Sequence, residues 1–352
     1  MKLAFITGSR AEYGYSEPLI KKLHKDPFFD LHLIVTGAHL SYEFGYTVQD
    51  IKYPIADEIE CILASNTSVG ISKALGLAVM GFAESYARLK PDLVFLTGDR
   101  FEMLAAGLAA HIANIPCAHN GGGELTEGAY DDAFRHSITK LSQLHFVSTD
   151  IYRDRVIQLG EQPDSVFNVG ALEIEGLIPR INYKKTYKIV LAYYRATLTL
   201  DKPVSFELPN GFKYILIKPN PDVGGFTSDS PLLIFNKLSR ADFHKHLLHS
   251  DALIGNSSAG LMDSPALGIP SINIGDRQRG RLKASSVIDC EPTKESIQAA
   301  FDKLYSKEFQ DSLKDIKNPY KGGNVSGRII EILKEKAQNL NLKKQFYNLP
   351  RL

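Results

Sequence analysis

Short apolar runs that end in glycine, threonine or serine recur along this chain, separated by longer stretches with helical spacing. In the first half the runs are LAFITG, LHLIVTG, LVFLTG, CAHNGGG, LHFVST and VFNVG, which lie between residues 3 and 170. Apolar residues three and four positions apart predict helices at 70–89 and 101–113. Nearly continuous apolar strands that alternate with helices indicate a parallel sheet covered by helices on both faces.

The same rhythm restarts after about residue 186, with YKIVLAYY, YILIKPN, ALIGNSS and PSINIG. A charged stretch at 179–188, PRINYKKTYK, separates the two series and is typical of a linker. A length of 352 residues also favours two domains over one. We therefore predict an α/β chain of two Rossmann-like, doubly wound parallel-sheet domains with a cleft between them. The expected bounds are 1–178 and 187–330, followed by a C-terminal helix and tail at 331–352.

Composition narrows the choice of partners. The 41 lysines and arginines balance 40 acidic residues, so net charge gives no argument for binding nucleic acid or a membrane surface. No apolar run is long enough to cross a membrane, and the first one is typical of a strand and not of a signal peptide. Three widely spaced cysteines form no disulfide pattern, which favours a reducing compartment, and we expect a cytoplasmic protein.

Two loops of the first domain follow predicted strands, and ligands of such sheets bind beyond the carboxyl ends of the strands. GSRAEYG at 8–14 is a glycine turn that leads into a helix, with Arg10 beside free backbone donors. Such a helix start favours an anion, although a plain turn explains the glycines equally well. TGDRFE at 97–102 places Asp99 and Arg100 at another strand end, where Asp99 could instead cap the next helix.

A third loop follows the strand ALIG in the second domain. Ser257 and Ser258 offer hydroxyl groups and free amides at a helix start, which suits a diphosphate, and Asp263 is expected one to two turns into that helix, near a ribose. A capped helix without a ligand is the alternative. Arg277 begins a basic run, RQRGRLK, that could bind phosphate or be a solvated face.

A metal site is not predicted from the histidines of HKHLLH. His246 and His249 share a helix face, His244 does not, and no carboxylate or cysteine motif accompanies them. Cys117, at a strand end without a matched base, is expected to be a buried structural thiol.

Several of these segments together resemble a known family. They are TGSRAEYG, GDRFE, GGGELTEGAYDDAFRHSITKLSQLHFVST, RVIQLGEQPDSVFNVG, IGNSSAGLMDSPALGIPSINIGDRQRGR and ASSVID. The chain is similar to the hydrolysing UDP-N-acetylglucosamine 2-epimerases, and most of all to the type found in bacterial sialic acid biosynthesis. The likeness is strong over 1–176 and 250–330 and weak over 190–245.

The resemblance implies a glycosyltransferase-B-like fold and a two-step reaction. UDP is eliminated across C1–C2 to give a glucal, and water then adds on the other face to release N-acetylmannosamine. It implies a UDP-sugar substrate and UDP as partners, no cofactor, and a homodimer or homotetramer.

The resemblance also assigns site residues. Asp99 and Asp131 match the family's catalytic acids. Asp132 and Glu124 are further candidates for proton transfer near Gly121–Gly123, whose backbone can approach the sugar closely. Asp263 stands where the family has glutamate, and Arg135 with His136 matches a supporting pair. The residues that match UDP contacts are Arg10, Arg100, Asn220, Ser257, Ser258 and Arg277.

Two positions depart from the family pattern. Gly121 stands where the family presents glutamate or histidine, and Tyr194 with Arg195 replaces a His-Pro pair that faces the substrate. Two alternatives to the epimerase of UDP-N-acetylglucosamine therefore stay open. One is a nucleotide-sugar-binding homologue with reduced or lost catalysis, and the other is an epimerase of a different nucleotide-activated acetamido sugar.

Overall fold

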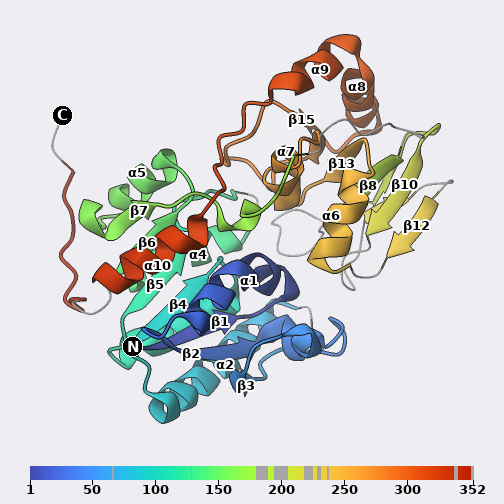
Figure 1. Ribbon diagram of the computed structural model, residues 1–352. Helices are drawn as coiled ribbons and strands as arrows, with labels where there is room; N and C mark the ends of the chain where they lie inside the picture. The colour runs from blue at the N-terminus through green and yellow to red at the C-terminus, as the bar shows by residue number, and fades with distance from the viewer. Residues whose placement is uncertain are drawn as a thin grey trace. The chain divides into compact units, whose positions relative to one another are not determined.

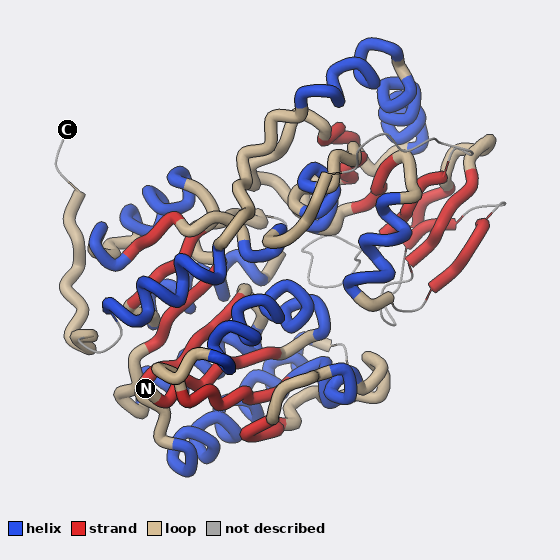
Figure 2. Tube along the Cα trace, viewed as in Figure 1, coloured by secondary structure: helices blue, strands red, loops and turns tan. Residues whose placement is uncertain are grey.

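The computed structural model describes residues 1–65, 67–127, 129–179, 189–193, 205–217, 225–227, 231–235, 238–336 and 340–349. The chain divides into two compact units, each an α/β structure (Figures 1 and 2). Unit 1 comprises Met1–Glu124, Asp131–Glu175 and Gly322–Leu352, and unit 2 comprises Leu125–Tyr130 and Gly176–Lys321. The domain bounds expected from the sequence, at 178, 187 and 330, stay a prediction.

Unit 1 contains a seven-stranded parallel sheet with the order β3-β2-β1-β4-β5-β6-β7. Six of these strands coincide with the apolar runs, and most end just before a glycine or a polar residue; β3 was not among the runs, and β7 ends before Val169. Their bounds are β1 Lys2–Thr7, β2 Asp30–Thr36, β3 Ile55–Ile59, β4 Leu93–Thr97, β5 Cys117–Asn120, β6 Leu144–Val147 and β7 Val166–Asn168.

Alternate side chains of these strands pack on opposite faces of the sheet. Leu3 and Phe5 join one core with residues of α1 (Arg10–Lys25) and α10 (Val325–Lys336). Ala4 and Ile6 join the other core, with α2 (Ser68–Leu89) and α3 (Phe101–Ile112). Figure 2 shows helices on both sides of this sheet. Two further helices, α4 (Asp131–Leu141) and α5 (Asp150–Gln158), complete the unit.

The helix α10 returns from the end of the chain to unit 1. Its first turn is held by Glu175, whose carboxylate accepts bonds from the Ser326 amide at 2.8 Å and the Ser326 hydroxyl at 2.7 Å. Arg328 donates to the carbonyl of Val169 at 2.8 Å. These contacts fasten the start of α10 to unit 1.

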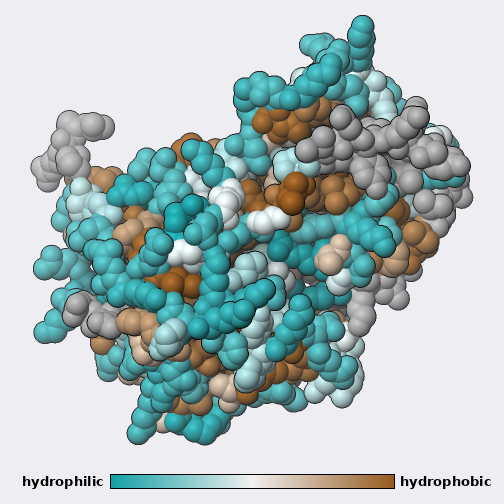
Figure 3. Space-filling view, in the orientation of Figure 1, coloured by the Kyte–Doolittle hydropathy of each residue, from teal (hydrophilic) through white to brown (hydrophobic). Residues whose placement is uncertain are grey.

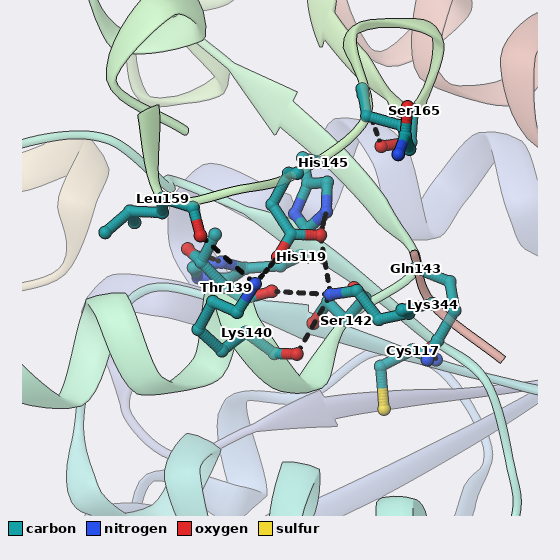
Figure 4. A network of polar contacts seen from close by, with 12 residues as sticks. Cys117, His119, Thr139, Lys140, Ser142, Gln143, His145, Leu159, Ser165 and Lys344 are labelled. Atoms are coloured by element: carbon teal, nitrogen blue, oxygen red, sulfur yellow. Dashed lines mark hydrogen bonds and ion pairs between the residues drawn. The ribbon is translucent and has the colours of Figure 1, made fainter. Parts of the chain in front are cut away.

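The tail after α10 is fixed by Lys344 (Figure 4). Its ammonium group donates to the carbonyls of Lys140 at 2.9 Å and Ser142 at 2.5 Å, at the C-terminal end of α4. It also pairs with the buried carboxylate of Glu161 at 2.6 Å, which receives His145 Nε2 at 3.1 Å as well. These charged donors lower the pKa of Glu161 to about 2 although its burial acts in the opposite direction. The tail therefore anchors the end of α4 that lies away from Asp131.

Unit 2 contains a six-stranded parallel sheet with the order β12-β10-β8-β13-β14-β15, and a small sheet of β9 and β11. The strand bounds are β8 Ile189–Tyr193, β9 Ser205–Glu207, β10 Lys213–Ile217, β11 Gly225–Thr227, β12 Pro231–Phe235, β13 Ala252–Gly255, β14 Ser271–Ile274 and β15 Val287–Cys290. One face packs on α8 (Lys294–Tyr305) and α9 (Lys307–Ser312), and the other on α6 (Arg240–Leu248). The fold prediction of two doubly wound parallel-sheet units is confirmed.

The stretch from β8 to β12 differs from an ordinary Rossmann-like unit. Between Ile189 and Phe235 the described residues hold five strands and no α-helix. This is the region where the family likeness is weak. No helix within the described part of the chain is long and apolar enough to cross a membrane.

Candidate active site

The strand order of unit 1 reverses between β1 and β4. On one side of this pair the chain runs through β2 and β3, and on the other through β5, β6 and β7. Ligands of open parallel sheets bind at such a reversal, beyond the carboxyl ends of the strands. The loop after β4 carries Asp99 and Arg100, and Arg10 begins α1 directly after the short loop that follows β1, so the topology places these predicted residues at one edge of the sheet.

Arg135 connects the acidic residues of this edge. Its guanidinium is buried, forms an ion pair with the carboxylate of Asp99, and donates to the carbonyl oxygen of Glu124 at 3.0 Å. It also pairs with Asp132 Oδ1 at 3.2 Å. Arg135 is thus a support that fixes the loop after β4, the glycine-rich loop after β5 and the start of α4 relative to one another.

Asp131 is the first residue of α4 and is buried, with 6% of its surface exposed. The negative charges of Glu102, Glu12 and, more weakly, Asp131 raise the pKa of Arg100. A carboxylate at a helix N-terminus is stabilised by the helix dipole, and here it also lies in the field of a buried guanidinium. Asp131 therefore lies near enough to Arg100 to interact with it electrostatically.

Two buried acids of the site, Glu12 and Glu102, were missed by the reasoning from sequence. Arg100 binds Glu102 through both carboxylate oxygens, with Nη2–Oε1 at 3.1 Å and Nε–Oε2 at 3.2 Å. Burial raises the pKa of Glu12 to about 7, against the attraction of Arg100. The signal was present in the sequence, because TGSRAE at 7–12 and TGDRFE at 97–102 share the pattern T-G-x-R-x-E.

His119, on β5, holds the loop after β4 by a hydrogen bond. Burial lowers the pKa of His119 to about 3, so the ring is neutral at ordinary pH. Its Nε2 donates to the carbonyl of Gly98 at 2.9 Å, and Nδ1 lies 3.2 Å from the hydroxyl of Thr139 on α4. A neutral ring that donates through Nε2 can only accept through Nδ1. The Thr139 hydroxyl, which carries one proton, also lies 3.0 Å from the carbonyl of Arg135, to which it donates within α4.

Gly121, two residues further, has φ +103, a conformation that L-residues rarely adopt. The nearest atoms to a Cβ at this position belong to the backbone of Gly98, at 3.8 and 3.9 Å. A Cβ atom would fit there without a clash, but the backbone conformation is that of glycine.

In unit 2 the corresponding reversal of strand order lies between β8 and β13. The loop after β13 is built around the carbonyl of Asn256, which accepts bonds from Arg277 Nη1 at 3.0 Å and Gln278 Nε2 at 2.8 Å. Both donors are buried. Ser257 caps the turn Ser258–Gly260 by accepting from the amide of Ala259 at 3.3 Å. Arg277 therefore supports the serine loop from within the unit and is not part of a solvated face.

Asp263 differs from its expected place. The segment after β13 is a short 3-10 turn, and Asp263 opens a separate four-residue helix, α7 (Asp263–Ala266). It therefore lies at a helix start and not one to two turns inside a helix, because the loop does not continue directly into α7. His244 Nε2 contacts Asp263 Oδ1 at 2.7 Å, a neighbour that the sequence did not indicate.

The structure thus brings the predicted residues together in two groups. Unit 1 groups Asp99, Arg100, Glu124 and Asp131, with Arg10 on the neighbouring loop, and unit 2 groups Ser257, Ser258, Asp263 and Arg277. Asn220 and Tyr194 lie outside the described residues. Among the residues that are described, no group of three His, Cys, Asp or Glu side chains could hold a metal ion.

Comparison with known proteins defines the class. The UDP-N-acetylglucosamine 2-epimerase family profile matches residues 21–205 and 209–334. A Campylobacter jejuni protein named GDP/UDP-N,N'-diacetylbacillosamine 2-epimerase (hydrolyzing) is 36% identical over 88% of each chain. The Escherichia coli polysialic acid biosynthesis protein P7 is 33% identical over 99% of this chain and 98% of its own.

The chain therefore belongs to the UDP-N-acetylglucosamine 2-epimerase family, as its motifs predicted. The crystal structure of the Neisseria meningitidis UDP-GlcNAc 2-epimerase bound to UDP-GlcNAc shares the fold, with a TM-score of 0.76 and 19% sequence identity. The alignment covers 96% of this chain and 100% of that one.

Proposed function

We propose that this protein is a hydrolysing 2-epimerase that converts UDP-N-acetylglucosamine and water to N-acetylmannosamine and UDP. The observation that carries the proposal is that Asp99, Glu124 and Asp131 lie near the guanidinium groups of Arg100 and the buried Arg135, at the carboxyl edge of the unit 1 sheet. Elimination requires a base for the C2 proton and positive charge for the departing diphosphate. Carboxylates beside guanidinium groups supply both.

In this proposal Asp131 removes the C2 proton as the C1–O bond breaks and UDP leaves, which gives the glucal. Water then adds its hydroxyl to C1, and an acid, Asp99 or Glu124, returns a proton to C2 on the opposite face. The loop at Ser257 and Ser258, with Arg10 and Arg100, binds UDP by hydroxyl groups, amides and charge. Asn220 and Asp263 keep the nucleotide-binding roles that the resemblance implied.

A second candidate substrate is UDP-N,N'-diacetylbacillosamine. It is favoured by the 36% identical relative, whose name includes that sugar. The relative named for polysialic acid biosynthesis instead supports the N-acetylmannosamine product. Which of the two sugars turns over faster decides between them, because both reactions use the same elimination chemistry.

The test is incubation with each UDP-sugar in D₂O, followed by proton NMR. The expected result is free UDP, a free 2-epimeric sugar and deuterium at C2, since the C2 proton is exchanged during the reaction. Accumulation of an epimerised UDP-sugar would contradict the hydrolysing reaction. UDP binding without turnover of either sugar would instead support the binding-only alternative.

We also propose a cytoplasmic homo-oligomer, a homodimer at least. Cys61, Cys117 and Cys290 are free thiols, which supports a reducing compartment. The solvent face of α2 carries exposed Leu77 and Met80.

On the face of the molecule that Figure 3 shows, apolar residues lie among hydrophilic ones. If two copies of α2 pack antiparallel about a two-fold axis, Leu77 of one lies opposite Met80 of the other, and Lys73 lies opposite Glu84. Light scattering should give the mass of a dimer or tetramer, and Met80→Lys should lower it.

A further inference from the structure

Glu12 is a buried acid that has no place in the reaction described so far. It lies on the first turn of α1, two residues after Arg10, which begins the helix, and 5% of its surface is exposed. One of its oxygens, Oε2, accepts the amide of Gly8 at 3.0 Å. A buried carboxyl group so close to a ligand loop is a candidate for a functional role.

The other oxygen points to the neighbouring loop. A Cβ added to Gly98 would lie 3.4 Å from Glu12 Oε1, and one added to Gly8 would lie 3.2 Å from Oε2. The carboxyl group therefore lies between the two glycines that begin the loops after β1 and β4. Because neither glycine has a side chain, both leave space for the carboxyl group of Glu12.

The sheet register explains why the two loops match. Leu3 pairs with Leu93 and Phe5 with Phe95, and the same offset separates Gly8 from Gly98. The two T-G-x-R-x-E segments thus lie side by side at one level of the sheet. The parallel pairing of β1 with β4 therefore places side by side two segments that are 90 positions apart in the sequence.

The two T-G-x-R-x-E segments differ in charge, because the second has Asp99 where the first has Ser9. Arg100 is engaged on both oxygens of Glu102, which is fully buried. Glu12 is then a second buried carboxyl group near the same guanidinium, with Glu102 and Asp99 as further negative neighbours and Tyr15 on its own helix. The pKa of Glu12 at about 7 means that the group changes charge near neutrality.

We propose that Glu12 is a positioning residue for the UDP-sugar: its carboxyl group holds the loop of Arg10 and the loop of Asp99 and Arg100 at one spacing. The inference rests on the proposed function. Ionised Glu12 adds a negative charge beside the loops proposed to bind the diphosphate, so UDP binds more weakly when Glu12 loses its proton. Below about pH 7 the group is neutral and the repulsion is absent.

Two variants test this inference. Glu12→Gln keeps the shape and an acceptor for Gly8, but it cannot change charge. Its UDP dissociation constant, measured by calorimetry at pH 6 and pH 8, should rise less between the two values than that of the wild type. Glu12→Ala removes the support, and kcat/KM should fall roughly tenfold to a hundredfold, as for a small misplacement of reacting groups.

The matched control is Glu17→Gln on the same helix, whose side chain is 31% exposed and bonds to Tyr53. It should leave both quantities unchanged. The inference is overturned if the UDP dissociation constant of Glu12→Gln changes with pH as in the wild type and Glu12→Ala keeps the wild-type kcat/KM. If Glu12→Ala does not fold, the response of Glu12→Gln decides. The UDP measurement needs no turnover, so a failed epimerase assay with a Glu12-dependent pH response would sink the proposed function and not this inference.

Discussion

The candidate loops of the two units lie at the same topological place but are built from different chemistry. In unit 1 the loops and helix starts beyond the strands hold carboxylates paired with guanidinium groups, Asp99 with Arg135 and Glu102 with Arg100. In unit 2 the loop after β13 consists of glycine, serine hydroxyls and a carbonyl held by Arg277 and Gln278. The first arrangement suits proton transfer, and the second suits binding of an anion without chemistry.

If this division holds, variants in unit 1 should change turnover and variants in unit 2 should change affinity. The largest effect is expected for Asp131→Asn, because an amide keeps the shape of the side chain but cannot take a proton. The turnover number should fall by about 10²–10⁴-fold, as is typical for loss of a general base. UDP affinity should stay near that of the wild type.

The neighbouring substitution Asp132→Asn is the control for Asp131→Asn. Asp132 pairs with Arg135 at 3.2 Å and with His136 at 3.6 Å, so its loss weakens a support. Steady-state kinetics should show a clearly smaller loss than for Asp131→Asn. Equal losses in both variants would mean that the acidic pair acts only through the position of α4.

The next largest effect concerns unit 2. The double variant Ser257→Ala/Ser258→Ala removes two hydroxyl groups from the proposed diphosphate loop. UDP binding should weaken by roughly 1–3 kcal/mol, the range for lost hydrogen bonds to a charged group. Calorimetry measures the change, and the turnover number at saturating substrate should alter little.

Ser306→Ala gives the control in the same unit. Its hydroxyl caps α9 by accepting from the Phe309 amide at 3.2 Å, away from the proposed site. This variant should lose stability and keep its UDP affinity. A double serine variant that binds UDP as the wild type does would remove the nucleotide site from this loop.

Much of the fold of both units could be predicted from the sequence. The strand that begins at Leu93 and the helices α2 and α3 were found because their burial leaves a regular apolar pattern. The short strands β9 and β11 were not found, since three residues leave no readable period. The place of Asp263 was wrong for a related reason, because a 3-10 turn and an α-helix start look alike in sequence.

The site was predictable only one loop at a time. Arg10 and Asp99 were found because each follows an apolar run and a glycine. The meeting of Glu12 with the loop of Gly98 depends on strand order and register, which no local pattern contains. The same is true of Lys344, whose partners lie about two hundred positions earlier in the chain.

The third prediction concerns that lysine and tests how unit 1 holds α4. Lys344→Met removes the donor that joins the tail to α4 and Glu161. Because Glu161 keeps Lys140 and His145 as partners, the free energy of unfolding should fall by roughly 1.5–3 kcal/mol, the range for hydrogen bonds of a charged group. Denaturant unfolding measures it.

Lys343→Met makes the same change of charge one residue earlier, on an exposed side chain. It should alter stability little, and Lys344→Arg should restore part of the loss. If the two methionine variants are equally stable, the tail does not anchor α4.

The smallest effect is expected for the stability of two glycine variants, one at Gly121, which has a positive φ, and one at Gly76, within α2. Gly121→Ala meets no atom closer than 3.8 Å, so any loss of stability comes from its φ of +103 and not from a clash. The expected loss is about 1–2 kcal/mol, the usual penalty of the left-handed region for an L-residue. Gly76→Ala on α2 also adds a methyl group into open space, but within a helix, where alanine is favoured. It should therefore stabilise the protein slightly under the same denaturant titration.

A neutral Gly121→Ala would show that the backbone can relax there, and the family's glutamate could then be restored by Gly121→Glu without strain. In that case turnover should rise, because the new carboxylate would join the acids of unit 1 and leave the binding loop of unit 2 untouched.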